Sequence, residues 1–572
     1  MVRIHPPQLL SARPLQVRKS FTILPAAVLL LHALIALHAA RHLSPTWDEI
    51  AYPAAGLAQI RTGQLKLNTV NPYLSKIIYA VPLLFTPVEL PFNDPSWSTA
   101  DEYRFGYAFT FHNVVDAKEI VFLSRVPVVV FSVLTGLLLY LWIASACGPI
   151  GGLLALMCYV TTPALLSRAS VAQLEMPMYF FILSAIIAHE RWFESNNRRY
   201  LQLSAILTGF GALCKLVVLP LIPTFVLLNL FFHPATPAMR QRWWSIASFL
   251  GLSGAVFLSG YLPWSGGVAA LVKTARNLVT FDQILPYYWA GKTSENVSAL
   301  VSWPAFFAKA PLHTLVAAAA GWWAWREGRA RETARVHLAV FFAACLGSVL
   351  FFKHAVSTIQ LSPAYLAVAG LAGGLAFSWK KGWGPRCAIV ALFALGAADV
   401  FSVHPNYIAY FNPLAGGANR GYRWLADSDQ DWGQSLPALA AFQRKEGNPP
   451  MVLCYSGSGD PVAYGISYQD LLSPALATRE RKDFLYPDED RPRYLAVGTK
   501  VLQSEPRFFS WLSTSMTPKT VVGQTFLVYD VSHNADAFGW MSEIYRFTGR
   551  PEQARKAALW EKQISASTDN PT

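Results

Sequence analysis

The chain has 572 residues, of which 53% are hydrophobic and only 14% are charged. With a mean hydropathy of +0.31 it is too apolar for an ordinary soluble protein, in which about 25% of residues are charged. The net charge of +13 does not indicate a nucleic-acid partner, because the basic residues fall in short loops between apolar stretches. The six cysteines form no CxxC pair and no metal-binding spacing.

Apolar stretches long enough to approach the thickness of a bilayer recur along the first 403 residues. The first, at about 21–40, lacks an A-x-A cleavage site, which predicts an anchor and not a removed signal peptide. The fifth and sixth are short, and whether they form one broken helix or two stays open. We predict a polytopic α-helical membrane protein with about eleven transmembrane helices. After the first, the spans lie at about 125–146, 149–167, 174–190, 200–214, 216–232, 245–264, 304–325, 335–352, 361–379 and 385–403.

The basic residues predict the orientation of the chain, because cytoplasmic loops are enriched in Lys and Arg. The intervening loops carry only Arg168, Lys215 and Lys353. We therefore expect a cytoplasmic N-terminus, an extracytoplasmic C-terminal region and an integral plasma (bacterial inner) membrane location. The N-terminal arm and alternate loops carry Arg3, Arg13, Arg18, Lys19, Arg191, Arg198, Arg199, Arg240, Arg242, Arg326, Arg329, Arg331, Arg335, Lys380, Lys381 and Arg386.

This orientation divides the chain into four parts: a cytoplasmic arm (1–20), a transmembrane domain (21–403), an extracytoplasmic α/β domain (404–534) and a helical hairpin with a tail (535–572). A first outer loop at about 41–124 contains an apolar stretch, 77–88, that is too short to span and suits an interfacial or re-entrant helix. In the tail, strand patterns at 450–455, 494–497, 520–522 and 525–529 alternate with helical patterns at 434–445 and 535–565.

Two sets of carboxylates are expected at the outer membrane edge, where charge is expensive and usually functional. Asp48 and Glu49 directly follow the first span and could supply a general base or a metal ligand. The alternative is a solvated helix N-terminus, where the macrodipole favours acidic residues. Glu175, at the start of the fourth span, could hold a substrate hydroxyl or an ion, or could cap the helix.

Five cations are predicted at the same outer face, and together they suit a lipid phosphate whose negative charge grows as it leaves. Each one alone is also compatible with a side chain that snorkels to the membrane surface. They are Arg125, Arg168, Lys215, Lys309 and Lys353.

Two motifs in the tail resemble binding motifs for calcium and for nucleotides, but the spacing of their residues does not fit either. Asp427-Ser-Asp429-Gln-Asp431-Trp-Gly433 resembles a calcium loop, but its glycine falls one place late and its twelfth position is Ala438. A structural turn that packs the tail on the membrane domain is the better interpretation. Gly457-Ser-Gly459-Asp-Pro461 is too short for a nucleotide-binding fingerprint.

Several motifs, taken in order, resemble those of one family over residues 40 to about 530. Asn71-Pro72-Tyr73-Leu74, after the Asp48-Glu49 pair, is similar to the D-E…H-P-P-L opening of the family 39 glycosyltransferases. These are the bacterial relatives of protein mannosyltransferases, with the GT-C membrane fold. Asn71 stands where His is usual and Glu175 where Asp is usual. Further similar stretches are Arg125-Val-Pro127, Leu174-Glu175-Met-Pro177, Lys215, Lys309-Ala-Pro311, Tyr407–Gly417 and Gly421–Gln434.

The resemblance implies transfer of a sugar from a polyprenyl-phosphate-linked donor in the membrane to an acceptor protein, lipid or glycan, with inversion. It makes Asp48 the base and Glu49 its partner or the ligand of a divalent metal ion. It makes Lys215 a phosphate clamp, together with Arg125 and Lys353. The remaining substrate-binding residues would be Asn71, Tyr73, Arg168, Glu175 and Lys309. The C-terminal domain would bind the acceptor or cap the site.

Two other classes of function remain as alternatives. A transporter or flippase of a lipid-linked substrate would show internally repeated halves, which the sequence lacks. A non-catalytic scaffold would use its tail to recruit a partner. The sugar, the acceptor, metal dependence and oligomeric state are not specified by the sequence.

Overall fold

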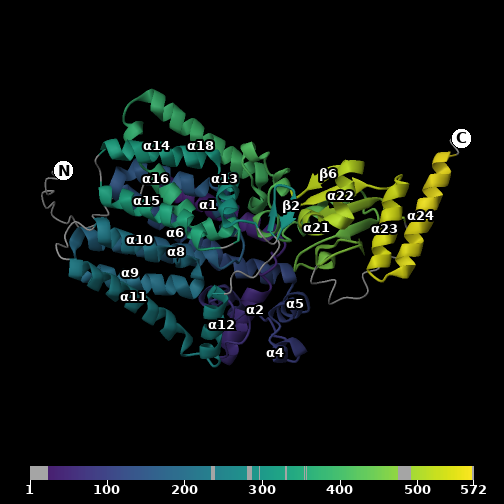
Figure 1. Ribbon diagram of the computed structural model, residues 1–572, viewed down its shortest axis with the longest axis horizontal. Helices are drawn as coiled ribbons and strands as arrows, with labels where there is room; N and C mark the ends of the chain where they lie inside the picture. Colours follow the sequence, from purple (N-terminus) through teal and green to yellow (C-terminus); the bar gives the residue numbers. More distant parts are fainter. Residues whose placement is uncertain are drawn as a thin grey trace.

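The computed structural model describes residues 23–232, 239–279, 287–294, 297–328, 331–352, 354–355, 357–474 and 491–569. The predicted cytoplasmic arm, 1–20, and Lys353 lie outside these residues. The apolar helices lie side by side in one part of the molecule, and the strands with the last helices form the other part (Figure 1). The protein is therefore a polytopic helical membrane protein with a C-terminal α/β region, as predicted.

Apolar helices follow most of the predicted spans. By length and composition, five of the described helices can cross a bilayer, or six if the pair α7–α8, bent by 119°, is one span. The remaining predicted spans correspond to shorter or interrupted helices, so the total of about eleven stays a prediction. The helices are α1 (Ile23–His42), α6 (Ala117–Val160), α7 (Pro163–Ser170), α8 (Glu175–Ser195), α9 (Arg198–Cys214), α10 (Leu221–Leu227), α11 (Met239–Tyr261), α13 (Ser302–Lys309), α14 (Leu312–Gly328), α15 (Glu332–Gly347), α16 (Ala364–Ala372), α17 (Leu375–Trp379) and α18 (Trp383–Val403).

Helix α6 contains the predicted span at 125–146 and most of the one at 149–167, which continues into α7. Gly148 has φ 83° and ψ 171°, a backbone conformation that interrupts a helix and that glycine adopts at low cost. The chain folds back at this point, because the hydroxyl of Tyr159 lies 2.9 Å from that of Ser132, 27 residues earlier. The second and third predicted spans therefore pack against each other as neighbours.

The membrane helices approach closely where their residues are small. A Cβ added at Gly321 of α14 would lie 2.2 Å from the carbonyl oxygen of Leu371 in α16. A Cβ added at Gly374 would lie 2.1 Å from the carbonyl oxygen of Gly321. Such small residues allow backbone contact between helices in a membrane, where burying apolar surface gives no advantage over lipid.

Gly321→Ala should therefore destabilise the protein by about 1–3 kcal/mol, because the new methyl group forces α14 and α16 apart. The matched control is Gly254→Ala in α11, where a Cβ would meet nothing within 4 Å. That variant should be as stable as the wild type or slightly more stable, since Ala favours a helix over Gly. The measurement is the apparent melting temperature of both variants in one detergent. Equal melting temperatures would contradict the packing described here.

The first outer loop folds as short helices beside the ends of the membrane helices, and Figure 1 shows α2, α4 and α5 grouped there with α12. The apolar stretch predicted at 77–88 belongs to a helical segment, Leu74–Phe85, that is too short to span. Lys76 in this segment is buried, and its ammonium group donates to the Asn68 and Asn71 carbonyl oxygens at 2.6 and 3.0 Å. The helices of the first outer loop are α2 (Ala51–Thr62), α3 (Leu74–Ala80), α4 (Pro95–Thr99) and α5 (Glu102–Phe111). A later part of the chain, after α11, contributes α12 (Gly267–Val279), β1 (Tyr287–Trp289) and β2 (Lys292–Ser294).

The C-terminal region is a five-stranded sheet of order β4-β3-β5-β7-β6 with helices around it. Strand β3 pairs in parallel with β4 and β5, whereas β7 is antiparallel to β5 and β6. The four strands predicted in the tail correspond to β3, β5, β6 and β7; the two-residue β4 was not predicted. Its elements are α19 (Leu436–Lys445), β3 (Met451–Cys454), β4 (Gln469–Asp470), β5 (Tyr494–Gly498), α21 (Thr499–Ser504), α22 (Pro506–Ser515), β6 (Thr520–Val522), β7 (Phe526–Asp530), α23 (Ala535–Phe547) and α24 (Pro551–Asp569).

Helices α23 and α24 pack together as the predicted hairpin. Buried residues of the hairpin, including Phe538, Met541 and Ile544, share an apolar cluster with Leu495 and Val497 of β5. The hairpin is therefore part of the core of the C-terminal region.

Candidate functional site

Asp48 lies in the turn between α1 and α2. The hydroxyl of Tyr103, in α5, donates to Asp48 Oδ1 at 2.8 Å, and Tyr52 lies beside the same carboxyl group. Burial raises the pKa of Asp48 to about 6, although the Tyr103 hydrogen bond and the cations Lys215 and Lys500 act in the opposite direction. A carboxyl group with such a pKa can accept a proton at neutral pH and hold it more firmly than an ordinary aspartate does.

Glu49, the next residue, forms a buried ion pair with Arg125 of α6. Arg125 donates from Nε to Glu49 Oε1 at 2.8 Å and from Nη2 to Glu49 Oε2 at 2.7 Å. Thr46 also donates to Oε2 from its backbone N–H and its hydroxyl, and the Ala172 N–H donates to Oε1. Burial would raise the pKa of Glu49, but the ion pair outweighs it and holds that pKa below the usual range.

Arg125 uses the rest of its guanidinium group to hold the end of α1. Its Nη1 donates to the carbonyl oxygens of Ala40 and Leu43, and its Nη2 to that of Ser44, at 2.7–2.9 Å. Every N–H of the side chain is thus engaged. Both oxygens of Glu49 are also bonded within the protein. The predicted roles of Arg125 in phosphate binding and of Glu49 as a metal ligand or partner of Asp48 stay predictions. Together Arg125 and Glu49 fix the turn that presents Asp48.

Lys215, which directly follows α9, meets Glu175, the first residue of α8. The Lys215 ammonium group forms an ion pair with Glu175 Oε1, and Glu175 is also within electrostatic range of Arg168. The other oxygen of Glu175 is buried and has no hydrogen-bond partner among the described residues. Lys215 is close enough to Asp48 to influence its carboxyl group. The structure therefore brings Asp48, Lys215, Glu175 and Arg168 to one region, and their roles in a substrate site stay a prediction.

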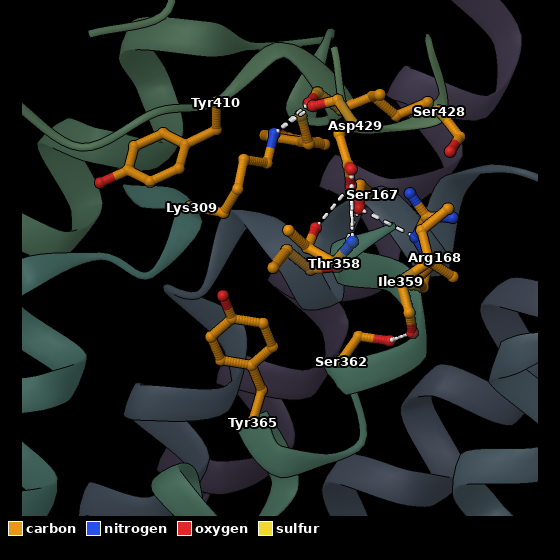
Figure 2. Close-up of a pocket in the computed structure, with 13 residues that line it drawn as sticks. Ser167, Arg168, Lys309, Thr358, Ile359, Ser362, Tyr365, Tyr410, Ser428 and Asp429 are labelled. Atoms are coloured by element: carbon orange, nitrogen blue, oxygen red, sulfur yellow. Dashed lines mark hydrogen bonds between the residues drawn. The ribbon is translucent and has the colours of Figure 1, made fainter. Parts of the chain in front are cut away.

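Arg168 reaches a small polar cavity between the membrane helices and the start of the tail. Its side chain is almost fully buried, and its Nη1 has no hydrogen-bond partner within the described part of the chain. Figure 2 shows Arg168 and Lys309 reaching this cavity from opposite sides, with Asp429 and Thr358 between them. A buried, incompletely bonded guanidinium group is a strong candidate for binding an anion.

Lys309 has structural partners that the sequence did not indicate. Its ammonium group donates to the carbonyl oxygens of Ile408 and Asp429 at 2.6 and 2.7 Å, and it lies 4.4 Å from the ring centre of Phe411. It therefore holds the chain that leaves α18, while it still lines the Arg168 cavity.

The Asp427–Gly433 segment is a connecting turn, as predicted, and its three aspartates face different partners. Asp427 binds the Lys500 ammonium group at 2.6 Å, and Asp429 accepts hydrogen bonds from Ser357 and Thr358. Asp431 accepts from the Lys500 and Gly433 backbone N–H groups. Among the described residues, no group of three or more His, Cys, Asp or Glu side chains is arranged to hold a metal ion.

This connecting turn also fixes the loop that carries Asp48. The Trp47 N–H donates to the Trp432 carbonyl oxygen at 3.1 Å, and the Ser44 N–H donates to that of Gln434 at 3.0 Å. Ser458, in the second glycine-containing motif, donates its hydroxyl to the Thr46 carbonyl oxygen at 3.0 Å. The loop that carries Asp48 is thus held between α6 on one side and the C-terminal region on the other.

Asn71 and Tyr73 have other local partners. Asn71 donates from its side chain to Asn68 Oδ1 at 3.3 Å. Tyr73 donates its hydroxyl to the Gly260 carbonyl oxygen at 2.6 Å and packs edge-on against Tyr261. The Tyr73 contacts anchor the first outer loop to α11. The substrate contacts predicted for Asn71 and Tyr73 stay a prediction.

Three residues of this region were missed by the sequence interpretation: Tyr103, Lys500 and Trp432. Tyr103 bonds Asp48 across 55 residues of chain, and the Trp432 ring lies 5.8 Å from the Arg168 guanidinium carbon. Tyr103 belongs to an aromatic-rich stretch, Glu102–Phe111, in which no local pattern distinguishes it from its neighbours.

Comparison with known proteins gives a family match for part of the chain. Residues 113–264, from just before α6 to just after α11, match the family described as dolichyl-phosphate-mannose-protein mannosyltransferase. The matched segment contains Arg125, Arg168, Glu175 and Lys215. No curated protein matches the chain significantly.

Three solved structures are similar over parts of the chain. ArnT from Cupriavidus metallidurans bound to undecaprenyl phosphate is 13% identical, with 89% of this chain and 97% of that chain covered and a TM-score of 0.45. The Archaeoglobus fulgidus oligosaccharyltransferase in its apo form is 12% identical (86% and 71% covered, TM-score 0.44). The Saccharomyces cerevisiae Pmt1–Pmt2 complex bound to the sugar donor is 20% identical (41% and 32%, TM-score 0.29). The family match confirms the predicted resemblance to protein mannosyltransferases over residues 113–264.

Proposed function

We propose that this protein transfers a sugar from a polyprenyl-phosphate-linked donor to the hydroxyl group of an acceptor at the extracytoplasmic membrane face. The family match at 113–264 supports glycosyl transfer. The alternation of basic loops supports the orientation, with the N-terminus in the cytoplasm and the C-terminal region outside a bacterial inner membrane. The single observation that carries the proposal is the meeting of Asp48 with the Lys215, Glu175 and Arg168 group where the membrane helices end.

The proposed reaction is an inverting displacement. Asp48 accepts the proton of the acceptor hydroxyl while that oxygen attacks the anomeric carbon. The bond between the anomeric carbon and the phosphate oxygen breaks, and polyprenyl phosphate leaves from the opposite face of the ring. Lys215 and Arg168 bind the phosphate, whose negative charge increases as it departs. Inverting glycoside chemistry requires the same carboxylate base on the face opposite the leaving group.

Arg168→Ala tests the phosphate site. The purified full-length protein is incubated with a panel of polyprenyl-phosphate sugars, and release of polyprenyl phosphate is followed. We expect the variant to be slower by about 10²–10³-fold, the usual cost of removing one donor to a developing charge. Arg168→Lys, which keeps a cation, should recover part of the rate. The matched control is Arg507→Ala, an exposed cation of α22. Wild-type release by Arg168→Ala would overturn the phosphate assignment.

The pH dependence of turnover follows from the raised pKa of Asp48. Below pH 6 its carboxyl group is protonated and cannot accept the acceptor's proton, whereas above pH 6 it is the charged base. The transfer rate at low substrate concentration should therefore rise from pH 5 to pH 7 with a midpoint near 6. The residual activity of Asp48→Asn should lack this rise. A flat profile in the wild type over the same range would contradict a base with this pKa.

A further inference from the structure

A second, more open groove begins beside the candidate base and continues along the C-terminal region. Its walls include Trp47 from the first outer loop, and Lys500, Ser504 and Glu505 from α21 and the residue that follows it. Ser456 and Ser473, from the loops after β3 and β4, complete the polar lining. The groove thus joins the loop that carries Asp48 to a region of chain more than 400 residues away.

The indole ring of Trp47 lies close to Asp48. Tyr103 donates a hydrogen bond to Asp48, and the centre of its ring lies 6.0 Å from that of Trp47. The Lys500 ammonium group lies 5.5 Å from the centre of the Trp47 ring and pairs with Asp427. A molecule lying against this tryptophan would therefore have one end close to the base.

The chemistry of the groove suits a sugar ring. A pyranose presents an apolar C–H face, which packs against an aromatic ring, and an edge of hydroxyl groups, which bond hydroxyl and charged side chains. Trp47 offers the aromatic surface. Three serine hydroxyls with Lys500 and Glu505 offer donors and acceptors along the edge.

An extended peptide fits this surface less well. It would need to pair with the nearest sheet edge, which is β4, the outermost strand on that side. Arg550 already occupies that edge, because its guanidinium group donates to the carbonyl oxygens of Asp470 and Leu471. A covered edge is a usual way to prevent the addition of another strand.

We propose that this groove binds a carbohydrate acceptor, with a pyranose ring against Trp47 and its reacting hydroxyl directed to Asp48. The inference rests on the proposed function and names the class of acceptor. A glycolipid and a soluble glycan share this chemistry.

Saturation-transfer NMR on the full-length protein in phospholipid nanodiscs tests the proposal. The probes are the methyl and the n-octyl glycosides of glucose, galactose, mannose and N-acetylglucosamine, with a pentapeptide containing Ser and Thr for comparison. At least one sugar should receive saturation, and Trp47→Ala should reduce that signal at least fivefold. Trp47→Phe should retain most of it, because an aromatic face remains. The control is Trp383→Ala, an exposed tryptophan at the start of α18.

The outcomes separate the groove from the reaction. Stronger binding of the octyl than of the methyl glycoside indicates a glycolipid acceptor, and equal binding a soluble glycan. Three results would overturn the carbohydrate proposal, even if the wild type cleaves the donor. They are binding of the peptide alone, binding of no probe, and a saturation-transfer signal of the sugar that persists in Trp47→Ala. The protein could instead bind sugar in a Trp47-dependent way but cleave no polyprenyl-phosphate sugar. That result would contradict the proposed function, whereas the assignment of a carbohydrate-binding groove would stand.

Discussion

Asp48→Asn should lower the transfer rate by about 10²–10⁴-fold, equivalent to roughly 3–5 kcal/mol of activation free energy. Asparagine keeps the shape of the side chain and can still accept the Tyr103 hydrogen bond, but it cannot take a proton at neutral pH. Donor affinity should change little, since we propose that Lys215 and Arg168 bind the phosphate. The measurements are steady-state transfer and the equilibrium binding of a polyprenyl-phosphate sugar by the same protein.

Asp101→Asn is the matched control in the same outer loop. Asp101 caps α5 by accepting a hydrogen bond from the Arg104 N–H, a role that asparagine performs equally well. If Asp48 only stabilised a helix N-terminus, both variants would show small stability changes and full activity. The geometry argues against that role, because the side chain bonds Tyr103 and the N-cap position of α2 is Ile50. Full activity in folded Asp48→Asn protein would leave Glu175 as the next candidate base.

Arg125→Ala should cost about 3–5 kcal/mol of stability, because it leaves the Glu49 carboxylate buried without its counter-charge. Three backbone carbonyl oxygens at the end of α1 lose their donor at the same time. We expect a large fall in the apparent melting temperature. A double variant, Glu49→Met with Arg125→Met, should recover much of the loss, since a buried pair can often be replaced by apolar side chains of similar volume.

The control for this pair is Arg41→Ala. Arg41 pairs with Glu119, and both side chains are more than one third exposed. Exposed ion pairs contribute about 0–1 kcal/mol, so the melting temperature should barely change. If Arg125→Ala and Arg41→Ala were equally stable, the Glu49–Arg125 pair would not stabilise the loop that carries Asp48.

Much of the fold follows from the period and length of the apolar stretches. The apolar runs at 125–146 and 149–167 predict a break between two spans, and the structure places that break at Gly148. The tail strands were predicted by short runs of Val, Leu, Phe and Tyr between turn residues. Strand β4 consists of only two polar residues, Gln469 and Asp470, and is too short to produce such a pattern. The helices α21 and α22 were not predicted either.

The site could be predicted only in part from the sequence, because the tertiary structure determines which charged side chains pair with one another. Asp48 and Glu49 are adjacent and chemically alike, yet one bonds Tyr103 and the other an arginine 76 residues away. Similarly, Arg125, Lys309 and Arg168 looked equivalent as cations at one membrane face. The structure distinguishes them by the number of donors that each has left: the Arg125 donors are all used, whereas Arg168 Nη1 has no partner among the described residues.

The most direct test of the central claim is a structure of Asp48→Asn protein with a polyprenyl-phosphate sugar bound. The inactive variant should retain the intact donor. We expect the donor phosphate within hydrogen-bond distance of Lys215 Nζ and the Arg168 guanidinium group, with the anomeric carbon facing residue 48. A donor phosphate bound elsewhere, with residue 48 remote from the sugar, would contradict it.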